Sequence, residues 1–249
     1  MGKVFLVGAG PGAADLLTVR AARLLARADV IFHDALVEPE VLALAPTARK
    51  IAVGKRCGAH SISQRFINKR LVDAALRENV VVRLKGGDPM LFGRAQEEID
   101  ALVEAGIEIE VVSGVTAALA GAADLNTSLT RRGVARSVVF VTPRVGEGEA
   151  KHGWARAAAA ADTAVIYMGA GEAIDVVAAL VEHGLARATP IAIVENAGRA
   201  SVKRWIGTLG ELPSLSARRG NGPALIVVGE IARVEQVRAD DWLATGTGV

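Results

Sequence analysis

The sequence is poor in the residues that mark several large classes of protein. Its single cysteine, Cys57, cannot form an internal disulfide bond or a multi-cysteine metal site. Aromatic residues make up only 4% of the chain, so alanine, valine and leucine must fill most of the core. The formal net charge of +2 is too small to indicate that the chain binds nucleic acid.

Long apolar runs are also missing. No stretch of about 18 uncharged apolar residues occurs, so we expect no membrane-spanning helix. Residues 1–7 lead directly into an apolar segment and lack the long apolar region and cleavage site of a signal peptide, which predicts a cytoplasmic location. With 249 residues, 22% of them charged, the chain is long enough for one large or two small folded domains.

Short apolar segments alternate with amphipathic ones along the chain. Near-continuous apolar strands separated by helices are typical of a parallel sheet covered on both faces. The last two strands could form an antiparallel section. The small, Ala/Gly-rich segment 113–127 interrupts the alternation, and we place a domain junction at its start, giving domains 1–113 and 114–249. The predicted strands are 4–7, 29–32, 50–53, 80–84, 107–112, 137–142, 163–168, 190–195, 202–209 and 223–231, and the predicted helices include 15–26, 64–78 and 95–104.

A glycine-rich turn follows the first predicted strand. It reads Gly8-Ala9-Gly10-Pro11-Gly12, and glycines let the chain turn sharply and let a ligand approach the backbone. Asp34, at the end of the second strand, stands about where an acid that binds a ribose would fall. This motif alone leaves three interpretations open, namely another nucleotide-type ligand, a nicotinamide-dependent dehydrogenase and a plain tight turn.

Two further loops repeat this design at the carboxyl ends of strands. Lys85-Gly86-Gly87-Asp88-Pro89 follows 80–84 and offers bare backbone amides and carbonyls to a flat, polar ligand. Ser113-Gly114-Val115-Thr116 follows 107–112, and Thr116 could bind a ligand or cap the next helix. Loops of this kind predict a binding site along one edge of a sheet.

Charged side chains near these loops have two interpretations. Arg94 and Glu97 lie one helical turn apart, which suits either a surface ion pair or a site. Basic clusters elsewhere could bind a small polyanionic substrate or belong to ordinary solvated surface. They are Arg131-Arg132-Arg136, Arg199-Lys203-Arg204 and Arg218-Arg219.

Together these motifs resemble the tetrapyrrole methylase family, and the resemblance spans nearly the whole chain. Its most specific part is the run Arg-Leu-Lys-Gly-Gly-Asp-Pro-Met-Leu-Phe-Gly-Arg at 83–94, followed by Glu97 and Glu98. This run, with Gly54-Lys55-Arg56, is closer to the branch that methylates uroporphyrinogen III than to the cobalt-precorrin or diphthine branches. Other matching segments are 7–12, 28–37, 113–117, 129–133 and 223–229.

The resemblance implies an α/β protein with two α/β/α domains and a cofactor cleft between them, working as a homodimer without a metal. The implied reaction is the methylation of uroporphyrinogen III at C2 and C7, which gives precorrin-2. Two molecules of S-adenosylmethionine become S-adenosylhomocysteine. A methyltransferase that acts on a later precorrin intermediate is the alternative, and the dehydrogenase is a more distant one.

The resemblance also assigns residues to roles. Asp34 and Lys55 match positions of proton transfer, and with Arg94 and Glu97 they form the expected catalytic set. Arg94, Arg132 and Met168 match substrate-binding positions. The expected cofactor contacts, most of them through the backbone, are Pro11, Gly86, Gly87, Asp88, Leu91, Thr116, Ala117, Met168, Ala197 and Ala224.

Two motifs depart from the family pattern. The family usually has proline and histidine where this chain reads Ser-Leu-Thr-Arg-Arg at 128–132, and Gly-Thr where it has Ala197-Gly198. Both departures are expected in the second domain, near the methyl acceptor. They leave open which tetrapyrrole the chain accepts and which pathway, siroheme or cobalamin, its product feeds.

Overall fold

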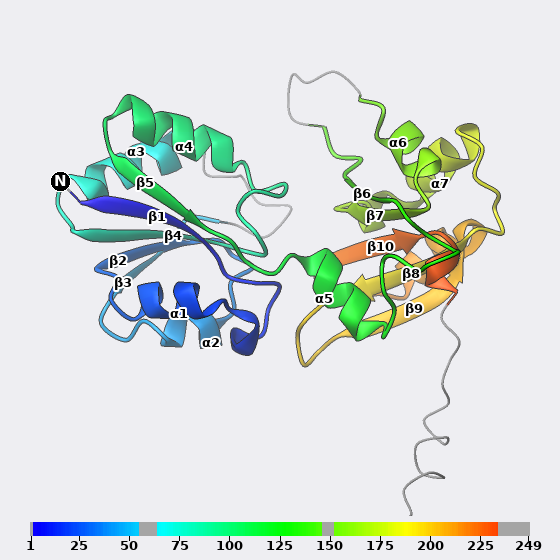
Figure 1. Ribbon diagram of the computed structural model, residues 1–249, viewed down its shortest axis with the longest axis horizontal. Helices are drawn as coiled ribbons and strands as arrows, with labels where there is room; N and C mark the ends of the chain where they lie inside the picture. Colours follow the sequence, from blue (N-terminus) through cyan, green and yellow to red (C-terminus); the bar gives the residue numbers. More distant parts are fainter. Residues whose placement is uncertain (1, 55–63, 146–151, 234–249) are drawn as a thin grey trace, which may run out of the picture. The chain divides into compact units, whose positions relative to one another are not determined.

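The computed structural model describes residues 2–54, 64–145 and 152–233 of the chain (Figure 1). Two compact units contain them. The first unit comprises Met1–Gly121 and Asn196–Val202, and the second comprises Ala122–Glu195 and Lys203–Val249. The boundary therefore falls eight residues after the predicted one, which stood between 113 and 114.

The first unit contains a five-stranded sheet in which every pair of neighbours is parallel. Its strand order is β3-β2-β4-β1-β5, and β1 lies between β4 and β5 with Lys3 opposite Val80 and Glu108. All five strands were predicted from the sequence, with bounds that differ by at most one residue at either end. They are β1 (Lys3–Gly8), β2 (Val30–His33), β3 (Arg49–Ala52), β4 (Val80–Lys85) and β5 (Glu108–Val112).

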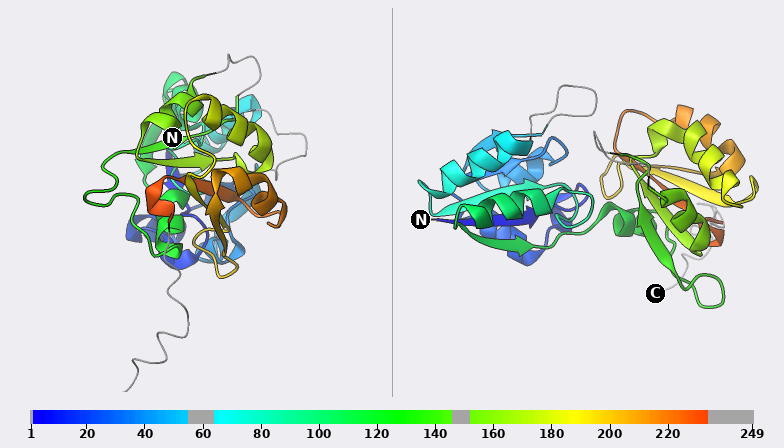
Figure 2. Two further views of the ribbon diagram at one scale, coloured as in Figure 1. Left: turned by 90° about the vertical axis from the view of Figure 1, so that its right-hand side faces the viewer. Right: turned by 90° about the horizontal axis from the view of Figure 1, so that it is seen from above.

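Helices cover both faces of this sheet, as the apolar strands require. Side chains alternate along each strand, so Phe5 and Val7 face α1 (Val19–Leu25) and α2 (Pro39–Ala43), while Val4 faces the opposite side. That opposite side is covered by α3 (Gln64–Ala75) and α4 (Ala95–Glu104), which pack side by side (Figure 2). The first unit is therefore a three-layer α/β/α domain.

The first predicted helix, 15–26, is divided in the structure. A 3₁₀ turn at Ala14–Leu16 precedes α1, and Leu17 and Thr18 separate the two. The Thr18 side chain accepts a hydrogen bond of 3.1 Å from the amide of Ala21, which caps α1 and fixes where it begins.

The second unit is built on a mixed sheet in the order β6-β7-β10-β8-β9. Only β6 and β7 are parallel, and the other neighbours are antiparallel. Three helices, α6 (Trp154–Ala160), α7 (Ala173–Glu182) and α8 (Leu212–Ala217), pack on one face around an apolar core. The strands are β6 (Val138–Val141), β7 (Thr163–Tyr167), β8 (Pro190–Glu195), β9 (Lys203–Thr208) and β10 (Ala224–Val228).

The suggested pairing of the last two strands is wrong. An antiparallel section exists, but β9 and β10 are not neighbours, because both pair with β8. The segment between them is no tight turn. It contains a 3₁₀ turn at Leu209–Glu211 and then α8, which packs on the face of the sheet and lets β10 enter between β7 and β8.

The segment Asn196–Val202 belongs to the first unit although both of its flanking strands belong to the second. The carbonyl of Gly198 accepts a hydrogen bond of 2.8 Å from the amide of Ala13, which holds this segment against the turn after β1. Short helix α5 (Ala117–Asp124) begins in the first unit and ends in the second. Within the described ranges, no helix is both long and apolar enough to cross a membrane.

Candidate functional site

The loops after β1 and β4 meet at the carboxyl edge of the first sheet. Beyond the strands themselves, the amide of Ala9 donates to the carbonyl of Lys85 at 2.7 Å. Gly10 and Gly87 then form a reciprocal pair, with N···O distances of 3.2 and 2.7 Å. The two glycine-rich motifs are therefore joined backbone to backbone, as the carboxyl-edge prediction requires.

The loop after β5 packs against the same pair of loops. A Cβ atom added at Gly114 would lie 2.3 Å from the carbonyl oxygen of Gly87, and one added at Gly8 would lie 2.6 Å from the Cα of Gly114. Real Cβ atoms do not approach backbone so closely, so both positions require glycine. Because neither glycine has a side chain, the three loops can pack closely against one another.

Asp88 fastens these loops together through its side chain. Its Oδ1 accepts from the amide of Met90 at 2.8 Å, and its Oδ2 accepts from the amide of Gly114 at 2.9 Å. A carboxylate that accepts backbone N–H bonds is a stable loop anchor. The side chain of Asp88 is thus occupied by the protein, and a ligand here would meet mainly backbone.

Gly87 is the point where this edge is open. Its φ of +68° is a left-handed conformation, and a Cβ atom built on it would meet no atom within 4 Å. The neighbouring Gly86 would meet only the Cβ of Leu36, at 3.5 Å. Bare backbone facing open space fits a flat nucleoside-type ligand, which needs close approach and polar main-chain partners.

Arg199 secures the turn after β1 from the segment Asn196–Val202. Its guanidinium donates to the carbonyls of Leu36 (2.9 Å) and Pro11 (3.4 Å) and pairs with Glu38. The side chain crosses directly over Gly12, where an added Cβ would lie 2.2 Å from its Cγ. The sequence marked Arg199 only as a member of a basic cluster, because nothing in its local pattern reveals the carbonyls of Pro11 and Leu36 as its partners.

A buried network of charges lies beside Asp34. Arg83, on β4, donates to Asp34 Oδ1 at 2.6 Å and to Glu98 Oε1 at 2.9 Å. Lys85 donates to Glu98 Oε2 at 2.9 Å, and Gln64 donates to Glu98 Oε1 at 3.1 Å. Glu98 is fully buried, whereas the side chain of Asp34 is 29% exposed, so Asp34 connects the network to the surface.

Burial and neighbouring charges shift the pKa values of the two cations of this network, Arg83 and Lys85, in opposite directions. Burial opposes the charge of Arg83, but Asp34 and Glu98 outweigh it and hold the pKa of Arg83 above its ordinary value. For Lys85, burial and the adjacent Arg83 prevail over Glu98, and they lower its pKa. Arg83 is therefore the permanent cation that faces Asp34.

Arg94 and Glu97 form a two-point ion pair at the surface of the first unit. Nε and Nη2 of Arg94 lie 2.7 and 2.8 Å from the two carboxylate oxygens of Glu97. The hydrogen bond from Arg94 lowers the pKa of Glu97, which favours its ionised form. Arg94 has a φ of 54°, an uncommon value for a residue other than glycine and one that is often found at functional sites.

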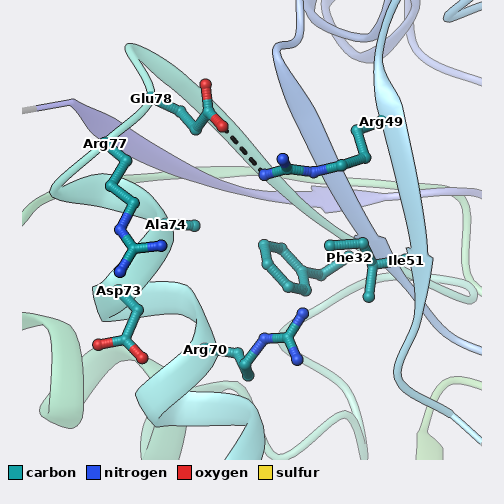
Figure 3. Close-up of a pocket in the computed structure, with 8 residues that line it drawn as sticks. All are labelled: Phe32, Arg49, Ile51, Arg70, Asp73, Ala74, Arg77 and Glu78. Atoms are coloured by element: carbon teal, nitrogen blue, oxygen red, sulfur yellow. Dashed lines mark hydrogen bonds and ion pairs between the residues drawn. The ribbon is translucent and has the colours of Figure 1, made fainter.

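The first unit also has a surface hollow of about 370 Å³ beside α3 (Figure 3). None of the predicted site residues lines it. Its two carboxylates are already engaged, because Glu78 accepts from Arg49 at 2.9 Å and Asp73 accepts from Lys69 at 2.8 Å. We assign no ligand to this hollow.

A family profile decides what kind of protein this is. The profile described as Tetrapyrrole (Corrin/Porphyrin) Methylases matches residues 3–213. The chain belongs to the tetrapyrrole methylase family. The match includes the three carboxyl-edge loops and most of the second unit, so the family assignment extends well beyond the glycine motif that first suggested a nucleotide-type ligand.

Individual members of the tetrapyrrole methylase family are similar over almost the whole chain. Siroheme synthase 1 of Klebsiella pneumoniae is 45% identical over 94% of this chain and 50% of its own length. The uroporphyrinogen-III C-methyltransferase of Pseudomonas aeruginosa is 43% identical over 93% of this chain and 95% of its own. The chain thus spans about half the length of the siroheme synthases it matches.

A solved structure shows the same fold. The uroporphyrin-III C-methyltransferase of Thermus thermophilus, complexed with S-adenosylhomocysteine, superposes with a TM-score of 0.83. It is 38% identical, and the match covers 94% of this chain and 100% of that one. The predicted fold class, an α/β protein of the tetrapyrrole methylase fold, is confirmed.

The structure brings part of the predicted cofactor set together in the first unit. Gly86, Gly87, Asp88 and Leu91 lie in the loop after β4, where the amide of Leu91 bonds the carbonyl of Asp88 at 3.3 Å. The rest of this group lies in the turn after β1, at the start of α5 and in the segment Asn196–Val202. These are Pro11, Thr116, Ala117 and Ala197.

The remaining predicted residues lie in the second unit or outside the description. Met168 directly follows β7, and Ala224 begins β10 beside it, since Tyr167 is opposite Leu225. Met168 has a left-handed φ of 57° and a side chain that is partly exposed. Arg132 lies on an exposed turn between Arg131 and Ala135. Lys55 falls outside the described residues.

Proposed function

We propose that this chain transfers methyl groups from S-adenosylmethionine to C2 and C7 of uroporphyrinogen III. The products would be precorrin-2 and two molecules of S-adenosylhomocysteine. The observation that carries the donor assignment is the open, side-chain-free edge at Gly87, where the loops after β1, β4 and β5 converge. The acceptor assignment is supported by the names of the similar proteins from Pseudomonas aeruginosa and Thermus thermophilus.

The protein's main task in this reaction is alignment. When bound, S-adenosylmethionine supplies an electrophilic methyl group, and an electron-rich pyrrole carbon is the nucleophile. A carbon–carbon bond forms while the carbon–sulfur bond breaks, and its electron pair stays on sulfur. Holding the pyrrole carbon, the methyl group and the sulfur in line accounts for much of the acceleration of such transfers. The rigid loops anchored by Asp88 and Arg199 would supply that geometry.

Asp34 is the better candidate for the group that receives the proton lost by the macrocycle after each transfer. Among the described residues only Arg83 bonds its carboxylate, and it does so through Oδ1, so no described residue donates to Oδ2. Glu97 is less suited, because Arg94 holds both of its oxygens and lowers its pKa. A carboxylate beside the substrate would also stabilise positive charge on the methylated ring.

Arg94 and Arg132 would bind carboxylates of the tetrapyrrole. A guanidinium presents two parallel N–H donors, which match the two oxygens of a carboxylate. Glu97 already orients the guanidinium of Arg94 in this way, and a tetrapyrrole carboxylate would share or replace Glu97 as its partner. The resemblance also predicts Met168 and Ala224 as cofactor contacts, a homodimeric state and a cytoplasmic location, and these stay predictions.

The donor assignment is tested by binding of S-adenosylhomocysteine to Gly87→Ala, measured by titration calorimetry. We expect the affinity to fall at least about tenfold, which corresponds to about 1.4 kcal/mol of binding free energy. The new methyl group would occupy space that the ligand needs. Gly106→Ala is the matched control, since Gly106 has the same φ of +68° and equally empty surroundings. Equal affinities in the two variants would contradict a ligand at Gly87.

A further inference from the structure

Arg83 lies between Asp34 and the protein core, with little freedom to move. Its side chain is 3% exposed, and each of its three nitrogens has a partner. Nε donates to Glu98 Oε1 at 2.9 Å, Nη1 donates to the carbonyl of Leu84 at 3.1 Å, and Nη2 donates to Asp34 Oδ1 at 2.6 Å. A planar guanidinium that is held at all three nitrogens has one orientation.

Glu98 is the anchor of this arrangement. It is fully buried on α4, and its two oxygens accept hydrogen bonds from Arg83, Lys85 and Gln64. A buried carboxylate is very unfavourable unless paired, so these donors fix its position. Glu98 holds the Nε end of Arg83 while the Nη2 end of the same guanidinium holds Asp34.

Stability alone does not account for these charges. Val81, Arg83 and Lys85 are alternate residues of β4 and therefore lie on the same face of the strand. On this face Val81 packs in the apolar core under α3 and α4. Arg83 and Lys85 therefore occupy positions where apolar side chains would be expected. Buried ion pairs can often be replaced by well-packed apolar residues without loss of stability. The network is better explained by the carboxylate that it reaches, Asp34.

We propose that Arg83, anchored by Glu98, is a positioning residue that holds the Asp34 carboxylate at the carboxyl edge of the first sheet. This inference rests on the proposed function, in which Asp34 receives the proton. A misplacement of a catalytic group by about 1 Å can reduce turnover by about 100-fold. The hydrogen bond from Arg83 to Asp34 would therefore be required for catalysis but not for binding of the methyl donor.

The test compares Arg83→Lys with Arg49→Lys. Lysine keeps the positive charge at position 83 but cannot bridge Glu98 and Asp34 with a planar fork. We expect kcat to fall by about 10- to 100-fold, while KM for S-adenosylmethionine changes by less than about threefold. Arg49→Lys is the matched control, because Arg49 lies on β3 of the same sheet, pairs with Glu78 and has an exposed side chain. Its kcat should equal that of the wild type.

Crystal structures of both variants give a readout that does not depend on activity. In Arg83→Lys the Asp34 carboxylate should move by about 1 Å or more, the displacement that affects turnover, and in Arg49→Lys it should stay in place. If Arg83→Lys does not fold, Glu98→Gln replaces it, since that change removes one of the carboxylate oxygens that accept from Arg83 and Lys85. An unmoved Asp34 in the folded variant would overturn the proposal.

The outcomes also separate this inference from the proposed function. If the wild type methylates uroporphyrinogen III and Arg83→Lys has an unchanged kcat, or raises KM alone, the positioning role is wrong and the function stands. If the wild type transfers no methyl group, the proposed function fails. The crystal structures then still decide whether Arg83 positions Asp34.

Discussion

Arg94 combines an unusual backbone conformation with a paired side chain. Its φ is 54° and that of Phe92 is 52°, so two residues other than glycine adopt left-handed conformations within one short turn. Such conformations persist only where the surroundings impose them, and they are frequent at ligand-binding sites. Here they present the guanidinium of Arg94 at the N-terminus of α4, already aligned by Glu97.

Arg94→Ala should reduce turnover at least about tenfold, because a hydrogen-bonded charge pair contributes about 1.5–3 kcal/mol. The measurement is steady-state methyl transfer with uroporphyrinogen III as acceptor. Lys203→Ala is the control, since Lys203 is an exposed residue at the start of β9 with no assigned role. Equal activity of the two variants would remove Arg94 from the substrate-binding residues.

Local patterns in the sequence identify some site residues and cannot identify others. The glycines at 8, 10, 86 and 87 stand out because each follows an apolar strand. Glu98 does not, since its role depends on Arg83, Lys85 and Gln64, which lie on two other elements. Arg199 stood out only as part of a basic cluster, because the partners of its guanidinium are more than 160 positions away in the sequence.

At the scale of elements, strands and helices were predicted well where hydrophobic periodicity is strong. Helix α4 (Ala95–Glu104) and strand β8 (Pro190–Glu195) begin and end where the sequence predicted. The order of the strands in the second sheet was harder to predict. It depends on α8, which carries the chain across the sheet face between β9 and β10, and periodicity alone does not reveal such a crossing.

Asp162 fastens two elements of the second unit. Its carboxylate, just before β7, accepts from the amides of Arg136 (2.8 Å) and Ser137 (2.9 Å) and from the Ser137 hydroxyl (2.8 Å), just before β6. These hydrogen bonds lower the pKa of Asp162 below its ordinary value of 3.8. The carboxylate therefore stabilises the folded state when ionised, and this stabilisation is lost as the pH falls through the folded-state pKa.

We expect Asp162→Asn to weaken the acid dependence of unfolding. The stabilisation from Asp162 is fully present above pH 3.8 and disappears below it, so the wild type should lose more stability than the variant on acidification. Urea unfolding between neutral and acidic pH measures the difference. Asp175→Asn is the matched control, because Asp175 is exposed on α7 and is not held by these amides. Parallel pH profiles for Asp162→Asn and the wild type would show that the hydrogen bonds do not act in this way.

At the scale of the whole molecule, the chain forms two units, and a segment between two strands of the second unit belongs to the first. The sequence predicted two domains and the parallel sheet of the first. It did not predict that Asn196–Val202 returns to the first unit, because a short run of small and polar residues between two strands resembles any loop. This return holds the segment against the turn after β1. The departure from the family pattern at Ala197-Gly198 therefore lies in the first unit, and its expected place in the second domain was wrong.

The measurement that tests the central claim most directly is anaerobic turnover of the purified chain with S-adenosylmethionine and enzymatically made uroporphyrinogen III, with products identified by mass spectrometry. The account predicts a product that carries two additional methyl groups and a matching amount of S-adenosylhomocysteine. Binding of S-adenosylmethionine without any gain of methyl groups on uroporphyrinogen III would contradict it, and the acceptor would then be another tetrapyrrole.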